Sequence, residues 1–134
     1  RGMVLADFDI DGDADLLVTH QFREPDLFRN DLDLSGKSWI GLQIIGDGKT
    51  VSRDGANVRI QVSWNGQSQF AEVLNVSGFS AQSDRRLLFG LDGWEGEVAV
   101  DLRWGNEEKS VRLRSGSYHK ILLGTAKIAQ SVPN

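Results

Sequence analysis

An acidic segment near the N-terminus gathers the groups best suited to chemistry. Five aspartates occur within nine residues: Asp7, Asp9, Asp11, Asp13 and Asp15. Carboxylates on alternate residues of a tight turn converge on one point, and a glycine, residue 12, permits the bend. Ca²⁺ takes roughly six to eight oxygen ligands, so the spacing predicts a calcium-binding loop to which Asp13 adds its main-chain carbonyl.

Three other interpretations of this segment compete with a calcium loop. An EF-hand needs a bidentate glutamate at the last loop position, and with Asp7 as the first position that place is taken by Val18. Mg²⁺ fits less well because it demands stricter octahedral geometry. A solvated acidic turn without a metal stays open, although five close carboxylates repel one another unless a cation neutralises them.

Trp94 is the second candidate for ligand contact. It lies in the turn Asp92-Gly93-Trp94-Glu95-Gly96, where an exposed indole could stack on a sugar or contact a partner protein. The alternative is a loop tryptophan that folds back to cap the core. Both readings stay open at this point.

The rest of the chain offers little catalytic chemistry. His20 and His119 are isolated, cysteine is absent, and no Gly-x-Ser-x-Gly elbow occurs. No pair of acids is singled out for glycoside hydrolysis. Basic residues are scattered rather than clustered, which disfavours nucleic-acid binding, and no apolar run approaches the roughly 20 residues of a membrane span. We therefore expect a non-catalytic protein that does not insert into membranes.

From residue 38 onward, apolar and polar residues alternate with period two, which predicts β-strands. The pattern places Trp64 and Trp104 at the ends of core-facing sides, and Asn65-Gly66 suits a two-residue hairpin turn. We expect an all-β chain, an antiparallel β-sandwich of about seven strands. The expected strands are 39–45, 58–64, 68–76, 86–91, 98–104, 109–114 and 118–123.

The first quarter of the chain is organised differently. Residues 1–33 carry 9 acidic and 3 basic residues, and short apolar runs precede and follow the aspartates. They predict a β-hairpin around the acidic loop, and two strands need a neighbouring structure to be stable. We expect three parts: the calcium hairpin (1–33), the sandwich (34–124) and a tail (125–134).

Two stretches carry a family likeness. The run from Asp7 to Val18, followed by Leu27-Phe28-Arg29-Asn30, resembles the calcium loop of FG-GAP (VCBS-type) repeats, the blades of integrin-like β-propellers. The remainder is similar to the ASPIC/UnbV domain of the cartilage acidic protein-like family. The matching motifs of that domain are Trp39-Ile40-Gly41-Leu42, Ser52-Arg53-Asp54-Gly55, Gly78-Phe79-Ser80-Ala81-Gln82-Ser83 and Leu88-Phe89-Gly90-Leu91.

The resemblance implies a function and partners. Asp7, Asp9, Asp11 and Asp15 match the side-chain ligands of the repeat, and Asp13 matches its main-chain ligand. The chain, which opens at Arg1, is expected to be part of a longer protein, with further propeller repeats upstream. We expect a calcium-binding extracellular, periplasmic or cell-surface module that contacts a protein or glycan. The alternative is an accessory carbohydrate-binding domain of a larger enzyme.

Overall fold

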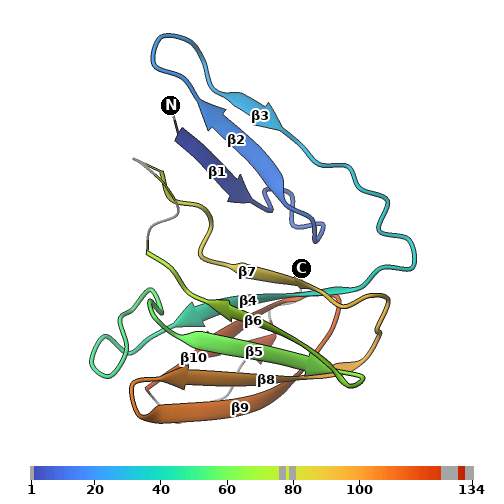
Figure 1. Cartoon of the computed structure of the whole chain (residues 1–134), viewed down its shortest axis with the longest axis vertical. Helices are drawn as coiled ribbons and strands as arrows, with labels where there is room; N and C mark the ends of the chain where they lie inside the picture. The colour runs from blue at the N-terminus through green and yellow to red at the C-terminus, as the bar shows by residue number, and fades with distance from the viewer. Residues whose placement is uncertain (1, 76–77, 79–80, 125–129, 132–134) are drawn as a thin grey trace.

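The computed structural model describes residues 2–75, 78, 81–124 and 130–131. These residues contain β-strands and no helix, which confirms the all-β prediction. The strands form three sheets (Figure 1): one three-stranded sheet near the N-terminus and two four-stranded sheets. In the described part of the chain, no helix is long and apolar enough to cross a membrane.

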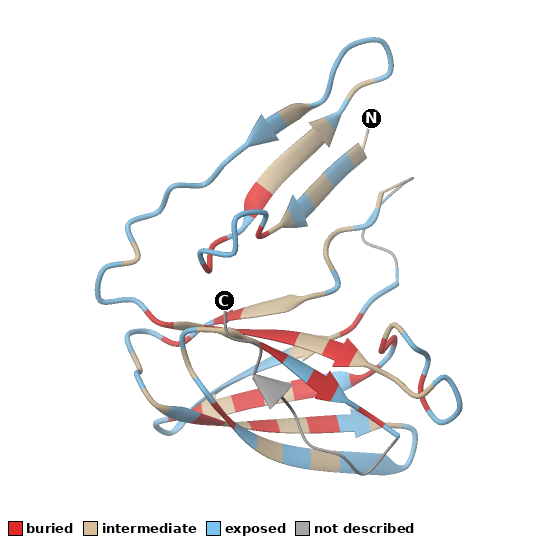
Figure 2. Cartoon of the chain, turned by 180° about the vertical axis from the view of Figure 1, so that it is seen from behind, coloured by how far each residue is buried: buried red, intermediate tan, exposed pale blue. Residues whose placement is uncertain are grey.

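The N-terminal sheet is an antiparallel meander that holds the acidic loop. Its strands are β1 (Gly2–Ala6), β2 (Asp15–Thr19) and β3 (Asp26–Phe28), in that spatial order. The acidic loop joins β1 to β2: Asp7 follows β1 directly, and Asp15 begins β2 and pairs with Ala6. In both views the loop points toward the other two sheets (Figures 1 and 2).

The two four-stranded sheets face each other across one apolar core, and we call them the two-sheet body. One sheet has the order β11-β10-β4-β7, and its strands are β4 (Trp39–Ile45), β7 (Leu87–Gly90), β10 (Tyr118–Leu122) and β11 (Gln130–Ser131). The other has the order β6-β5-β8-β9, and its strands are β5 (Arg59–Trp64), β6 (Gln67–Glu72), β8 (Glu97–Trp104) and β9 (Glu107–Arg114).

The period-two pattern places the core as expected. Ile60 and Val62 of β5 are buried with Val100 and Leu102 of β8, while the residues between them face outward. The opposite sheet adds its own apolar side chains, Ile40 among them, to the same cluster. Figure 2 shows burial concentrated between the sheets of the body. Removing this apolar surface from water is the main stabilising contribution to the body.

The predicted turn between β5 and β6 is confirmed. Asn65 and Gly66 both have positive φ, 41° and 75°, as a two-residue turn of this hand requires. Trp64 pairs directly with Gln67 across the turn. The return strand ends at Glu72, and residue 76, where it was expected to end, lies outside the described residues.

The antiparallel expectation is wrong for one pair of strands. β10 runs parallel to β4, with Tyr118 opposite Gly41, and therefore belongs to the other sheet from its chain neighbour β9. Gly116, between β9 and β10, donates its N–H to the carbonyl of Trp39 at 2.7 Å and so begins the new pairing. Side-chain alternation predicts which face of a strand is buried but carries no information about strand direction.

The two core tryptophans differ in burial. Trp64 is buried, with 6% of its surface exposed, as predicted. Trp104 packs against the core but is only partly buried, because it ends β8 next to the turn at Gly105. The prediction of a core position for Trp104 is therefore only partly correct.

The three-stranded sheet has apolar side chains on both faces. Leu5, Leu16 and Phe28 are aligned across the strands on one face, and the Leu17–Leu27 pair lies on the other. Leu5, Leu27 and Phe28 are about half exposed. Strands that are apolar on both sides are typical of sheets covered on both faces, so the described residues do not bury this sheet fully.

Candidate metal centre

Three of the five predicted ligands are brought together at the acidic loop. Asp7, Asp9 and Asp15 each offer a carboxylate oxygen, and these atoms lie within 4.8 Å of one another. Asp7 and Asp15 are buried, with 4% and 1% of their surfaces exposed, whereas Asp9 is exposed. The donor set is all oxygen, which suits a hard cation such as Ca²⁺.

Backbone amides fix the two buried carboxylates. Asp15 accepts hydrogen bonds from the N–H groups of Phe8 and Asn30, both at 2.8 Å. These bonds favour the anion and lower the pKa of Asp15. Asp7 accepts from the N–H of Gly12 at 3.0 Å and more weakly from that of Asp11 at 3.2 Å. The loop therefore holds both carboxylates in a defined orientation, and the bonds to Asp15 favour its charged form.

Asp11 and Asp13 lie outside this group of three. Asp11 accepts the N–H of Asp13 at 3.1 Å, and Asp13 accepts the N–H of Leu32 at 3.1 Å through Oδ2. Asp13 is 5% exposed, and its Oδ1 has no hydrogen-bond partner within the described part of the chain. Burial, followed by the charges of nearby aspartates, raises the pKa of Asp13. A cation close to Asp13 would offset the free-energy cost of burying its charged form. The burial of Asp13 therefore fits a metal site.

Arg29 offers a second way to neutralise the loop. Its Nε lies 3.1 Å from Asp9 Oδ2, and its Nη2 lies 2.6 Å from Asp31 Oδ1. The guanidinium side chain is 64% exposed, so these are surface ion pairs of small net value. A bound metal would compete with Arg29 for Asp9. In the alternative without a metal, Arg29 would instead neutralise part of the charge of the loop.

The loop rests on three side chains of the two-sheet body that sequence reasoning missed. Tyr118 donates its hydroxyl to Asp7 Oδ2 at 2.9 Å, and Arg86 donates Nη2 to the Asp7 carbonyl at 2.7 Å. The Arg86 guanidinium carbon lies 4.7 Å from the centre of the Tyr118 ring, whose pKa is raised chiefly by burial. Trp39 packs beside Tyr118 with ring centres 5.2 Å apart. Asp7 is thus held by the body as well as by its own loop.

A glycine inside β4 was the available signal for this contact. A Cβ atom on Gly41 would lie 2.0 Å from the Tyr118 ring, so only glycine leaves room for that ring. A glycine within a strand often marks such a close approach.

A second contact joins β1 to the segment before β7. Leu5 donates its N–H to the Ser83 hydroxyl at 3.1 Å, and its carbonyl accepts the N–H of Asp84 at 3.0 Å. This pairing lies at the edge of β1, whose other edge pairs with β2. The N-terminal sheet therefore meets the body at the acidic loop and along one strand edge.

Trp94 is folded against the body. It packs on the core cluster, is partly buried, and donates Nε1–H to the carbonyl of Glu97 at 3.1 Å. This is the placement that the capping alternative predicts, and a ligand-binding role for Trp94 stays a prediction.

The chain belongs to the ASPIC and UnbV family, because the family model matches residues 48–128, more than half of its length. This confirms the ASPIC/UnbV part of the resemblance. The matched region covers most of the two-sheet body and leaves the acidic loop outside it. No curated protein matches the chain.

Proposed function

We propose that this chain is a non-catalytic calcium-binding module, extracellular, periplasmic or at the cell surface, that contacts a protein or glycan. The observation that carries the proposal is the meeting of Asp7, Asp9 and Asp15 within 4.8 Å. Ca²⁺ would be held by these carboxylates. The buried Oδ1 of Asp13, which has no hydrogen-bond partner among the described residues, supports a cation nearby.

In this proposal calcium acts structurally. Asp7 is a candidate ligand and also the residue that Tyr118 and Arg86 of the body hold. A cation that fixes Asp7 would therefore stiffen the contact between the N-terminal sheet and the two-sheet body. The body is then presented in a defined orientation to whatever it contacts.

The N-terminal sheet is proposed to be a blade of the FG-GAP (VCBS) type. Its apolar side chains on both faces, including the exposed Leu27 and Phe28, suit a sheet packed between neighbouring blades. Further repeats of this kind in the same protein are the proposed partners of these faces. Pairing with them would bury apolar surface that the described residues leave exposed.

Thermal unfolding tests the calcium proposal. Extracellular calcium modules have a Kd of about 0.1–1 mM, so about tenfold excess should add roughly 1.4 kcal/mol to the free energy of unfolding. We expect the melting temperature to rise by about 4–7 °C when chelator is replaced by millimolar Ca²⁺. Mg²⁺ should give a smaller shift.

Two variants locate the effect. Asp9→Asn removes a candidate ligand that, among the residues the structure describes, accepts no backbone hydrogen bond and forms only a surface ion pair with Arg29. It should therefore reduce the calcium shift with little change in the metal-free protein. Glu24→Gln makes the same change of charge outside the loop, at an exposed position, and should leave the shift intact. An equal melting temperature in chelator and in calcium would refute the metal site and favour neutralisation by Arg29.

A further inference from the structure

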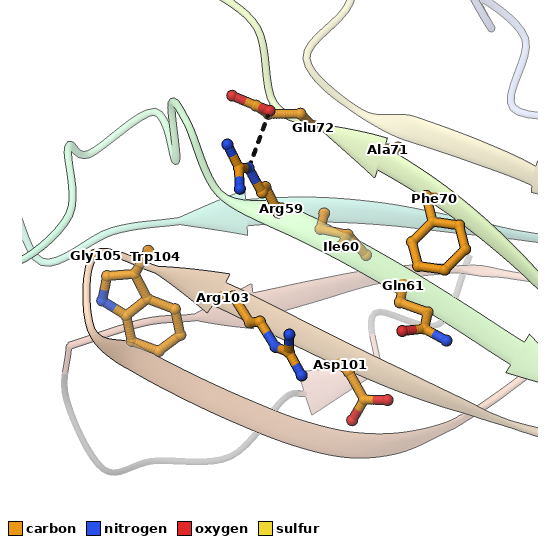
Figure 3. Close-up of a pocket in the computed structure, with 10 residues that line it drawn as sticks. All are labelled: Arg59, Ile60, Gln61, Phe70, Ala71, Glu72, Asp101, Arg103, Trp104 and Gly105. Atoms are coloured by element: carbon orange, nitrogen blue, oxygen red, sulfur yellow. Dashed lines mark ion pairs between the residues drawn. The ribbon is translucent and has the colours of Figure 1, made fainter.

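A groove lies on the outer face of the sheet formed by β6, β5, β8 and β9, on the side of that sheet away from the core (Figure 3). Its volume is about 700 Å³, within the range of roughly 300–1,000 Å³ that small-molecule sites occupy. No residue of the acidic loop lines it. The groove is therefore a separate candidate site.

Strand register builds the floor of the groove in two rows. Glu72, Arg59 and Arg103 are aligned across β6, β5 and β8. In the next row, two residues along each strand, Phe70, Gln61 and Asp101 are aligned in the same way. Because side chains two residues apart on a strand share a face, the two rows form one surface.

The charged groups of the floor are only loosely engaged with one another. Arg59 Nε lies 3.5 Å from Glu72 Oε2, and Arg103 Nε lies 3.8 Å from Glu108 Oε2. Both arginine side chains are largely exposed, so these pairs contribute little stability. Arg59 is also directly opposite Arg103, an arrangement of like charges that destabilises a sheet. The guanidinium groups are therefore available to a ligand.

An exposed aromatic ring lies beside these polar groups. Phe70 is 73% exposed and projects from β6, whose other residues are mostly polar. Trp104, which lies on the core-facing side of β8 with Leu102, only borders the end of the groove beside Gly105, where it is partly exposed (Figure 3). The site thus combines the apolar ring face of Phe70 with groups that donate and groups that accept hydrogen bonds.

We infer that this groove binds an uncharged oligosaccharide. Two arginines are matched by Glu72 and Asp101, so the floor has no net charge to attract an anion or nucleic acid. Four charged side chains also disfavour an apolar ligand. Sugar hydroxyls both donate and accept, which suits arginine, glutamine and carboxylate groups together, and the apolar face of a sugar ring stacks on the exposed ring of Phe70. The inference rests on the proposed function only in treating the chain as a binding module.

Titration of the whole chain with defined sugars tests the inference. The probes are the neutral hexasaccharides of β-1,4-glucose, β-1,4-mannose and N-acetylglucosamine, with hexagalacturonate as the acidic comparison. Binding is followed by ¹H–¹⁵N NMR, in calcium and in chelator. We expect at least one neutral probe to shift amide signals of β5, β6 and β8 together with the Trp104 indole signal.

Three variants at exposed positions separate the groove from the rest of the sheet. Phe70→Ala and Arg103→Ala should each weaken the bound neutral probe by about tenfold or more. Arg112→Ala removes the same charge from β9 at an exposed position outside the groove lining and should leave affinity within about twofold. Because all three side chains are exposed, the variants should fold.

The outcomes are distinct. The inference is overturned if no neutral probe binds, if only hexagalacturonate binds, or if the groove variants bind as tightly as the wild type. A calcium shift in melting temperature without sugar binding would refute the groove and leave the calcium proposal standing. Sugar binding that persists in chelator, with no effect of calcium on the melting temperature, would refute the calcium proposal and leave the groove standing.

Discussion

At the scale of single residues, Asp7 and Tyr118 form the decisive contact. Their hydrogen bond of 2.9 Å joins residues 111 positions apart in the chain. Asp7 is buried, so its charge needs partners, and it finds them in Tyr118 and in the N–H of Gly12. One carboxylate therefore serves both the loop and its attachment to the body.

Tyr118→Phe removes this hydrogen bond and should lower the free energy of unfolding by about 1–3 kcal/mol in chelator, as for hydrogen bonds to charged groups. The raised pKa of Tyr118 adds a pH dependence, because the folded protein favours the neutral phenol. Its contribution is complete below the ordinary pKa of about 10 and declines as the pH rises above that value.

Urea unfolding of both proteins between pH 7 and pH 11 measures this contribution. Tyr118 is the single tyrosine, so the difference between the two curves isolates it from lysine titration. The difference should shrink above about pH 10. A constant difference across this range would contradict the role of the phenol proton.

Trp94 is expected to behave as a cap. Trp94→Ala removes packing on the core and the hydrogen bond to Glu97, and should cost about 2–3 kcal/mol, less than for a fully buried tryptophan. Trp94→Phe keeps the ring and should recover most of this loss. Chemical denaturation measures both, and a loss below about 1 kcal/mol in the alanine variant would favour a ligand-contacting role instead.

At the scale of elements, the backbone of the acidic loop packs closely against Trp39 of β4. A Cβ atom on Gly12 would lie 2.1 Å from the indole nitrogen of Trp39, and Gly12 has a φ of 95°. The loop therefore approaches Trp39 as closely as backbone alone permits. This packing explains why the glycine is needed for more than the bend.

Gly12→Ala should destabilise the protein by about 1–3 kcal/mol more than Gly36→Ala. Gly36 also has positive φ, 70°, but no atom outside its chain neighbours lies within 4 Å of the added Cβ. The pair therefore separates crowding against Trp39 from backbone strain common to both sites. Equal losses in urea unfolding would show that the contact with Trp39 contributes nothing.

At the scale of the whole molecule, the described residues join the N-terminal sheet to the two-sheet body at two places. One is the loop on Trp39, Arg86 and Tyr118, and the other is the pairing of Leu5 with residues 83 and 84. If calcium stiffens the first contact, the second should tighten with it, because both belong to the same sheet.

Hydrogen exchange measures this coupling. Millimolar Ca²⁺ should slow exchange of the Asp84 amide, which donates to Leu5, by roughly tenfold if the contact opens with the loop. Tyr118→Phe breaks the hydrogen bond to Asp7 and leaves the ion pair between Arg86 and Asp84 in place, so it should remove most of this effect. Amides of β8, within the body, serve as the internal reference. Equal slowing at β8 would show general stabilisation rather than coupling.

The sequence alone determined the local features of this protein. Alternating residues around Ile60 and Val100 predicted the strands and their buried faces, because a strand exposes and buries side chains with period two whatever its partner. Asn65-Gly66 predicted its turn because few residues tolerate positive φ at both positions. The aspartate spacing likewise placed the candidate ligands in one loop.

Only the tertiary structure decided which strands pair and which distant residues come into contact. The parallel pairing of β10 with β4 brings Tyr118 under Asp7, and the register of β6, β5 and β8 assembles the groove from Phe70 to Arg103. Neither is encoded in alternation, which is the same for a parallel or antiparallel neighbour and for any register that keeps the buried face. Packing of the whole core selects one pairing among these, and the contacts between distant residues follow from that choice.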